Sequence, residues 1–236
     1  MSAIRPFEVH DSTGRPLDLA FLGGFNTPRP QLVDVDGDGD LDLVLQELTN
    51  QLVLLSNEGA AADGMPRFAL RSRAWAALEV GEWSRFVDVN GDQQPDVFGE
   101  LPFSYLRYWA NQGGTGFTAY ADSIRDTDGT AIFSDRQNIP QLVDIDCNQR
   151  LDLFVGRITG IILRYEADST PRPGDSRAPR FRLVTDRFED LEIITGQGSM
   201  HGANTMAFSD VDDDGDLDLI WGDFFEGGLL LFQNDG

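Results

Sequence analysis

Short apolar runs alternate with polar turns along the chain. The longest runs hold four or five residues, as at 52–55 and 229–232, whereas a membrane-spanning helix needs about 20 consecutive apolar residues. No long segment shows the 3.6-residue period of an amphipathic helix, and only 74–83 and 186–195 suit a short helical turn. The pattern therefore predicts an all-β protein without membrane insertion.

The apolar runs recur in a fixed order, which indicates an internal repeat. Four segments align, and each has an Asp-rich loop between two apolar runs. The loops are 34–42, 88–96, 144–152 and 210–218, and their first residues lie 54 to 66 positions apart. The run 30–34 is identical to 140–144. A polar loop between two short apolar runs is typical of a turn between antiparallel strands.

Two more strands follow most of the loops, so the repeat unit has four strands. Third strands are expected at 51–56, 105–110, 161–165 and 228–233, and fourth strands at 66–70, 116–120 and 179–184. Four strands in a repeat of about 40–60 residues are typical of propeller blades. The sequence predicts a single β-propeller domain, or a segment of one, over 1–236, with four-stranded antiparallel blades.

The last repeat stops after its third strand, and residues 6–10 resemble the missing fourth strand. Two interpretations are open. The N-terminal strand completes the last blade, or the chain is part of a longer propeller cut between blades. In the second case a second copy of the chain, or further blades, would cover the exposed blade face.

Acidic residues dominate the charge. The net charge is −22, from 40 acidic and 18 basic residues, and all 18 basic residues are Arg. Such a surface repels nucleic acid and anionic lipid. Asp outnumbers Glu by 30 to 10, which favours turns over helices. Cys147 is the only cysteine, so stabilisation must come from packing or from a metal.

The loop spacing D-x-D-x-D-G-x-x-D supplies the oxygen ligands that Ca²⁺ prefers. Side chains at positions 1, 3, 5 and 9 and the carbonyl of position 7 would surround the ion, and Gly at position 6 permits a left-handed turn. The predicted ligands are Asp34, Asp36, Asp38, Asp40 and Asp42; Asp88, Asn90, Asp92, Gln94 and Asp96; Asp144, Asp146, Asn148, Arg150 and Asp152; and Asp210, Asp212, Asp214, Asp216 and Asp218.

The four loops are not equal. The first and fourth have four ligand carboxylates and Gly at position 6, whereas the second and third have three carboxylates and Gln93 or Gln149 there. A non-Gly residue in the left-handed region costs about 1 kcal/mol, and Arg150 adds a positive charge. We expect up to four calcium ions, with affinity falling from the first and fourth loops through the second to the third.

The loops have other interpretations besides calcium binding. A single Asp-rich turn is as well explained by solvation, but four recurrences at matching positions favour metal binding. An EF-hand is excluded because position 12 holds no Glu. Magnesium and zinc are weaker candidates, since magnesium keeps more water and zinc prefers His and Cys.

The repeated loop between two strands resembles the FG-GAP and VCBS-type repeats, which form the blades of the integrin α-subunit propeller. The resemblance implies calcium in the first interstrand loop of each blade and a ligand-binding or adhesive role. It also implies an extracellular or cell-surface location and a ring of seven or eight blades. This chain has four repeats, so a homo-oligomer or further blades would complete such a ring.

The expected binding face gathers the turns between second and third strands. Exposed aromatic residues beside carboxylates suit a glycan or a protein ligand. The candidate ligand-binding residues are Glu100, Phe103, Tyr105, Arg157, His201, Asp223, Phe224 and Phe225. The alternative is that aromatic residues such as Trp83 and Phe224 fill gaps between blades.

Catalysis has little support in the sequence. His10 and His201 are the only imidazoles, and no nucleophile-elbow spacing is present. We therefore expect no enzyme and assign no catalytic residue. Two alternatives to a binding module are a purely structural module of a larger surface protein, and a polysaccharide lyase or hydrolase.

Overall fold

The computed structural model describes residues 8–17, 19–20, 22–47, 51–61, 64–101, 104–113, 116–135, 138–169, 177–192, 203–223 and 228–235. The chain divides into two compact units, Met1–Glu79 and Val80–Gly236, and each is described by itself. The described elements are strands and two short 3-10 turns, so the predicted all-β class is confirmed. None of the helical segments in these ranges is long and apolar enough to cross a bilayer.

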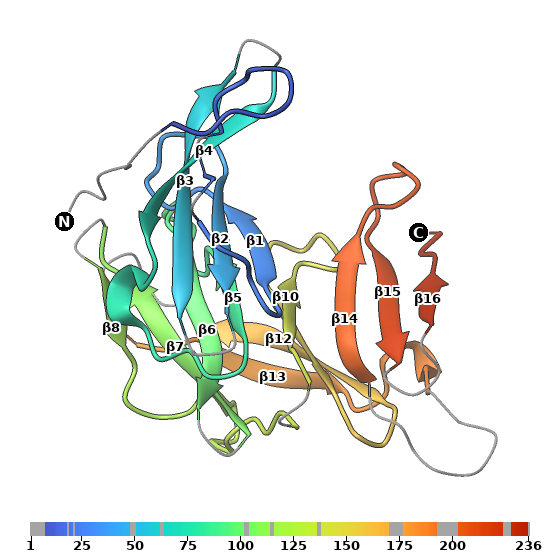
Figure 1. Ribbon diagram of the computed structural model, residues 1–236. Coiled ribbons are helices and arrows are strands. Elements are labelled where there is room, and N and C mark those ends of the chain that lie inside the picture. Colours follow the sequence, from blue (N-terminus) through green and yellow to red (C-terminus); the bar gives the residue numbers. More distant parts are fainter. Residues whose placement is uncertain are drawn as a thin grey trace. The chain divides into compact units, whose positions relative to one another are not determined.

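The first unit contains one antiparallel sheet whose strands follow one another in the chain (Figure 1). Its strands are β1 (Arg29–Val33), β2 (Asp42–Gln46), β3 (Leu52–Ala60) and β4 (Pro66–Ser72). Leu45, Val53 and Leu55 are buried, and Phe68 and Leu70 of β4 pack against them. The apolar runs of the first repeat therefore form the core of this sheet.

The second unit contains the other three sheets (Figure 1). The second sheet consists of β5 (Ser84–Val87), β6 (Asp96–Leu101), β7 (Tyr105–Asn111) and β8 (Phe117–Ala119). The third consists of β10 (Gln141–Val143), β11 (Asp152–Gly156), β12 (Ile162–Ser169) and β13 (Arg180–Thr185), with β9 (Arg125–Asp126) added parallel to β13. The fourth consists of β14 (Ala203–Ser209), β15 (Asp218–Asp223) and β16 (Leu229–Phe232). The strands predicted within the four repeats are confirmed, and β9 is an addition that the sequence did not predict.

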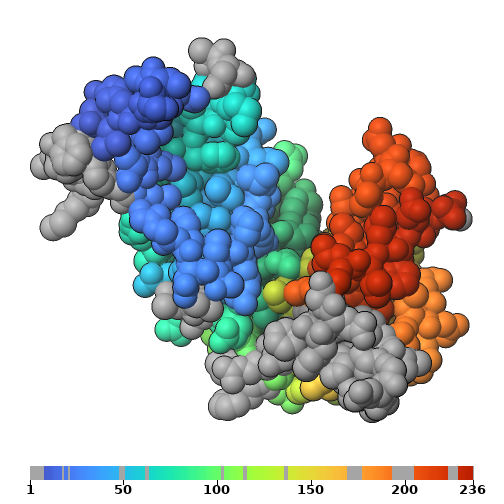
Figure 2. Space-filling view, turned by 45° about the vertical axis from the view of Figure 1, so that its right-hand side comes forward, coloured from blue at the N-terminus to red at the C-terminus, as the bar shows by residue number. Residues whose placement is uncertain are grey.

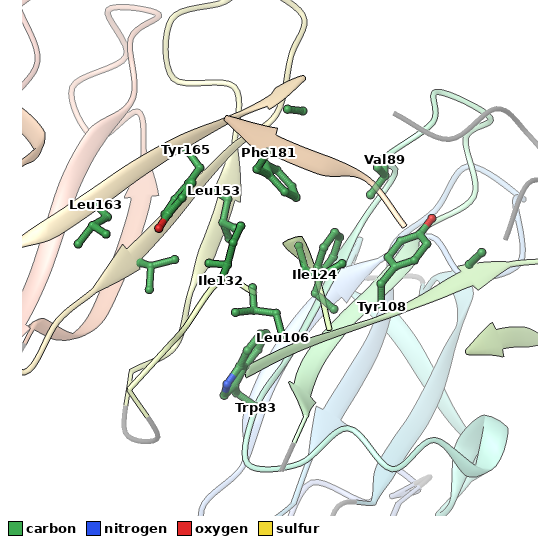
Figure 3. Close-up of a cluster of buried hydrophobic side chains, with 14 residues drawn as sticks. Trp83, Val89, Leu106, Tyr108, Ile124, Ile132, Leu153, Leu163, Tyr165 and Phe181 are labelled. Atoms are coloured by element: carbon green, nitrogen blue, oxygen red, sulfur yellow. The ribbon is translucent and has the colours of Figure 1, made fainter. Parts of the chain in front are cut away.

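Among the described residues, two apolar clusters hold the sheets of the second unit together. The larger one joins the second and third sheets; Figure 3 shows Leu106 and Tyr108 from β7 with Leu153 and Phe181 from the third sheet. Trp83 is 2% exposed and belongs to this cluster, so it fills a gap between blades, as the alternative interpretation predicted.

The smaller cluster joins the third and fourth sheets. Phe154 of β11 lies with its ring centroid 4.9 Å from that of Phe188 and 4.5 Å from that of Phe208 in β14. Trp221 of β15 is fully buried in the same cluster. Phe188 begins the 3-10 turn η2 (Phe188–Asp190), and a similar turn, η1 (Trp75–Ala77), lies in the first unit. Both helical turns were predicted from the sequence.

Four successive sheets, each built from strands adjacent in the chain, place the protein in the β-propeller class with four blades. In the described part of the last blade β16 is an edge strand at the surface (Figure 2), and Leu229 is 78% exposed. His10 forms an isolated bridge with Pro16, and residues 6 and 7 lie outside the described ranges. Closure of the last blade by the N-terminal segment, and a single domain over 1–236, stay predictions.

Candidate metal centres

Each Asp-rich loop connects the first and second strands of a blade. The strand register places position 9 opposite the residue just before position 1, as in the pairs Val33–Asp42 and Val143–Asp152. The second and fourth loops have the same register. The repeat therefore builds four hairpins that close at corresponding residues.

The Asp at position 9 is the buried anchor of each loop. Asp42, Asp96, Asp152 and Asp218 are at most 1% exposed. In every loop its carboxylate accepts a hydrogen bond from the backbone N–H of position 2, at N–O distances between 2.9 and 3.4 Å. Burying a carboxylate is favourable only when it is hydrogen-bonded or paired with a cation, so this residue fixes the loop to the blade.

The Asp at position 1 folds the loop around its own carboxylate. Asp34 accepts hydrogen bonds from the N–H groups of Gly37, at 2.7 Å, and Gly39, at 3.0 Å. Its counterparts Asp88, Asp144 and Asp210 likewise accept from position 6 at 2.8 to 3.0 Å. These bonds turn the chain back on itself, so the following Asp residues come close together.

The backbone is left-handed at two positions of every loop. Position 6 has φ of 91° at Gly39 and 99° at Gly215, and of 64° and 66° at Gln93 and Gln149. The strain predicted for Gln at this position is therefore present. Position 4 is left-handed as well, which the sequence analysis missed. The residues there are Gly37, Gly91, Cys147 and Asp213. The first loop alone has Gly at both positions.

Three of the loops bring three carboxylates together. The trios are Asp34, Asp36 and Asp38; Asp144, Asp146 and Asp152; and Asp210, Asp212 and Asp214, each with ligand atoms within 4.8 Å of one another. Oxygen atoms bound to one calcium ion at 2.3–2.6 Å lie at most about 5 Å apart. The second loop has Asn90 at position 3 instead, which offers an amide oxygen.

The electrostatics of the loops show the cost of this crowding. Burial raises the pKa of Asp36, and the carboxylates of Asp38 and Asp42 raise it further. Burial and the carboxylate of Asp214 raise the pKa of Asp212 in the same way. A divalent cation among these groups would favour their charged forms.

Two further carboxylates, those of Asp96 and Asp40, bear on whether the loops can hold a cation. In the second loop burial raises the pKa of Asp96 to about 6, against a hydrogen bond from the Asn111 N–H. In the first loop the Oδ1 atom of Asp40 is buried and has no hydrogen-bond partner among the described atoms. The donors of the first, second and fourth loops are carboxylate, amide and carbonyl oxygens, which suit Ca²⁺.

The third loop differs because an arginine reaches into it. Arg164 of β12 donates from Nε to Asp152 Oδ1, at 2.8 Å, and from Nη2 to Asp146 Oδ2, at 2.6 Å. The hydrogen bond from Arg164 lowers the pKa of Asp146. The sequence analysis considered only Arg150 near this loop, and Arg150 Nη1 lies 3.6 Å from Glu166 Oε2.

The predicted ligand-binding residues have different surroundings. Glu100 is buried, and its carboxylate accepts a hydrogen bond from the Glu82 N–H at 2.9 Å. This carboxylate is therefore held within the protein and is not displayed on the surface. Tyr105 and Arg157 both contact Phe133. Four other candidates lie outside the described residues: Phe103, His201, Phe224 and Phe225. The same holds for the side chain of Asp223.

Phe133 links Tyr105 and Arg157 into one surface group, which we call the Phe133 patch. The rings of Tyr105 and Phe133 meet edge to face with centroids 5.9 Å apart. The Arg157 guanidinium carbon lies 5.2 Å from the Phe133 ring centre, and its Nη1 donates to the Phe133 carbonyl at 2.9 Å. Phe133 is 39% exposed. The sequence analysis missed Phe133 because it lies outside the repeated strands.

No protein-family model matches the chain. A search of the curated proteins also finds no match. The assignment to the β-propeller class therefore rests on the fold, and the metal centres rest on the geometry of the loops.

Proposed function

We propose that the protein is a calcium-stabilised β-propeller module of the FG-GAP and VCBS type. The observation that carries the proposal is the shared loop geometry: a buried Asp at position 9, a folded turn around position 1, and clustered oxygen donors between them. The first, second and fourth loops offer donor sets that fit Ca²⁺. No residue of this proposal is catalytic.

The proposed ions act by stabilising each blade. Asp42 also accepts a hydrogen bond from the Asn57 N–H of β3 at 2.8 Å, so the loop is tied to the third strand as well as to its own hairpin. An ion that binds only the folded state raises stability by about 2.7 kcal/mol at a concentration 100 times its dissociation constant. We propose a location outside the cell or at its surface, where calcium is abundant enough to fill such sites.

Thermal melting in calcium and in EDTA tests the metal proposal. Calcium is expected to raise the melting temperature, and magnesium at the same concentration is expected to do so less. Asp34→Ala and Asp210→Ala should each remove most of the calcium-dependent gain of one site, whereas Asp144→Ala should remove the least. An equal loss from all three variants would contradict the ranking of the loops.

We further propose that the module binds a protein or a glycan through the Phe133 patch. An exposed aromatic ring between a tyrosine and an arginine offers stacking and charged hydrogen bonds. The net charge of −22 disfavours nucleic acid. Glycan and protein arrays probed with the wild type and with Phe133→Ala test this proposal. A ligand whose binding is unchanged in the variant would place the binding surface elsewhere.

A structural role within a larger assembly is the second candidate. Leu229, Leu230 and Leu231 of the edge strand β16 are 46% to 78% exposed, and an exposed apolar edge favours pairing with another strand. Sedimentation analysis of the purified chain distinguishes the candidates. A stable dimer without any array ligand would favour the structural role.

A further inference from the structure

We infer that the guanidinium of Arg164 takes the place of the metal ion in the third loop, so that this blade carries its own cation. The inference rests on the proposed function, because it concerns which loops bind calcium. It reduces the expected number of ions from up to four to three. It also makes the third blade independent of calcium.

The contacts of Arg164 cover two of the ligand positions. Its Nε and Nη2 atoms donate to the two oxygens of Asp152, at 2.8 and 3.1 Å, which are position 9 of the loop. Nη2 also donates to Asp146 at position 3, at 2.6 Å. The Arg164 side chain is 15% exposed and that of Asp152 is 0% exposed. This is the forked geometry in which arginine binds carboxylates most strongly.

The other blades have no cation at the matching place. Arg164 pairs with Phe154, which is position 11 counted from the start of its loop. The residues that pair with position 11 in the other blades are Leu54, Tyr108 and Leu231. None of these side chains carries a positive charge, so in those loops the charge of the carboxylates is left for an ion to balance.

A second substitution in the third blade accompanies the arginine. In the other blades an Asn N–H donates to the Asp at position 9, and the donors are Asn57, Asn111 and Asn234, at 2.8 to 2.9 Å. In the third blade the corresponding residue is Ala167, and its N–H donates to the Leu151 carbonyl at 2.8 Å instead. Asp152 Oδ1 is therefore left for Arg164. The third blade thus differs from the other three at two positions, Arg164 and Ala167, and both differences favour the arginine in place of an ion.

The neighbouring polar groups complete an internal network. Glu166 of β12 accepts hydrogen bonds from Asn148 Nδ2, at 3.0 Å, and from Arg182 Nη2, at 2.8 Å. Asn148 is position 5, another predicted ligand. A calcium ion in this loop would have to displace the Arg164 guanidinium, which stays charged at every physiological pH. An ion bound beside the guanidinium would be repelled by its positive charge.

Equilibrium dialysis of ⁴⁵Ca²⁺ with the full chain tests the inference. The wild type is expected to bind three ions. Arg164→Leu introduces the residue of the first and fourth blades and is expected to bind a fourth ion. Arg182→Leu removes an arginine that pairs with Glu166 and does not touch Asp146 or Asp152, and this variant should bind three ions. Arg164→Gln, which keeps N–H donors but no charge, serves if the Leu variant does not fold.

Melting in EDTA provides a measurement that needs no calcium. Arg164→Leu should lower the melting temperature by roughly 10 °C, because Asp146 and Asp152 lose their counter-charge. Arg182→Leu should lower the melting temperature by about 2 °C or less, since the Arg182 side chain is 51% exposed and Glu166 keeps the nearby Arg150. Saturating calcium should restore much of the loss in Arg164→Leu and little in Arg182→Leu.

The outcomes separate the inference from the proposed function. Four ions in the wild type, or three in both the wild type and a folded Arg164 variant, would overturn the inference while leaving calcium binding intact. No calcium in the wild type would overturn the proposed function. In that case the EDTA melting still decides the role of Arg164, because equal losses in the two leucine variants would overturn it.

Discussion

Replacing Asp42 by alanine should destabilise the first unit even without calcium. The Asp42 side chain is almost fully buried and accepts hydrogen bonds from the N–H groups of Val35, at 3.1 Å, and Asn57, at 2.8 Å. Leaving a buried donor without an acceptor costs about 1–3 kcal/mol. Because both donors are only partly buried, we expect a total loss of roughly 2–4 kcal/mol.

Urea unfolding followed by circular dichroism, in EDTA and in calcium, measures this loss. In EDTA only the hydrogen bonds are lost, and in calcium the variant should in addition lack the gain from one ion. Glu58→Ala is the matched control, because it removes an exposed acid of the same sheet that pairs with Arg71 and should cost less than about 1 kcal/mol. If Asp42→Ala is no less stable in EDTA than Glu58→Ala, Asp42 does not anchor the loop.

Two further predictions concern the packing of the sheets from which the loops project. Phe154→Ala should lower the free energy of unfolding by about 3–5 kcal/mol, because the ring is fully buried between the third and fourth sheets. Chemical denaturation measures this loss, and a value below about 1 kcal/mol would contradict the packing. Gly99→Ala should cost about 1–3 kcal/mol, since the added Cβ would lie 2.7 Å from the Val80 carbonyl oxygen. Gly24→Ala, where nothing lies within 4 Å of the added atom, is its control and should melt like the wild type.

The strands and the loops could be predicted because their determinants are local. Apolar runs beside an Asp-rich turn give the hairpin, and repetition along the chain identifies the blade. The strain at Gln93 and Gln149 was also predictable, because it follows from their position in the aligned loop. These features need no knowledge of which residues meet across the fold.

The features that sequence reasoning missed depend on contacts across strands. Arg164 lies 12 residues beyond Asp152, and only the register of β11 and β12 brings the two together. Phe133 and β9 lie in a connection between repeats, where no pattern indicates partners. Glu100 resembles an exposed turn residue in sequence, but the tight approach of Gly81 to its side chain encloses it.

The carboxylate at position 9 has a consequence for how a blade comes apart. In the first, second and fourth blades its two oxygens hold the start of the loop and an Asn in or just after the third strand at once, so these segments cannot detach separately. The fourth strand has no such fastening to the carboxylate. Under mechanical force or protease attack, the fourth strand of a blade should therefore detach before the inner strands. The strand β8, with only three residues, should be among the first strands to unfold.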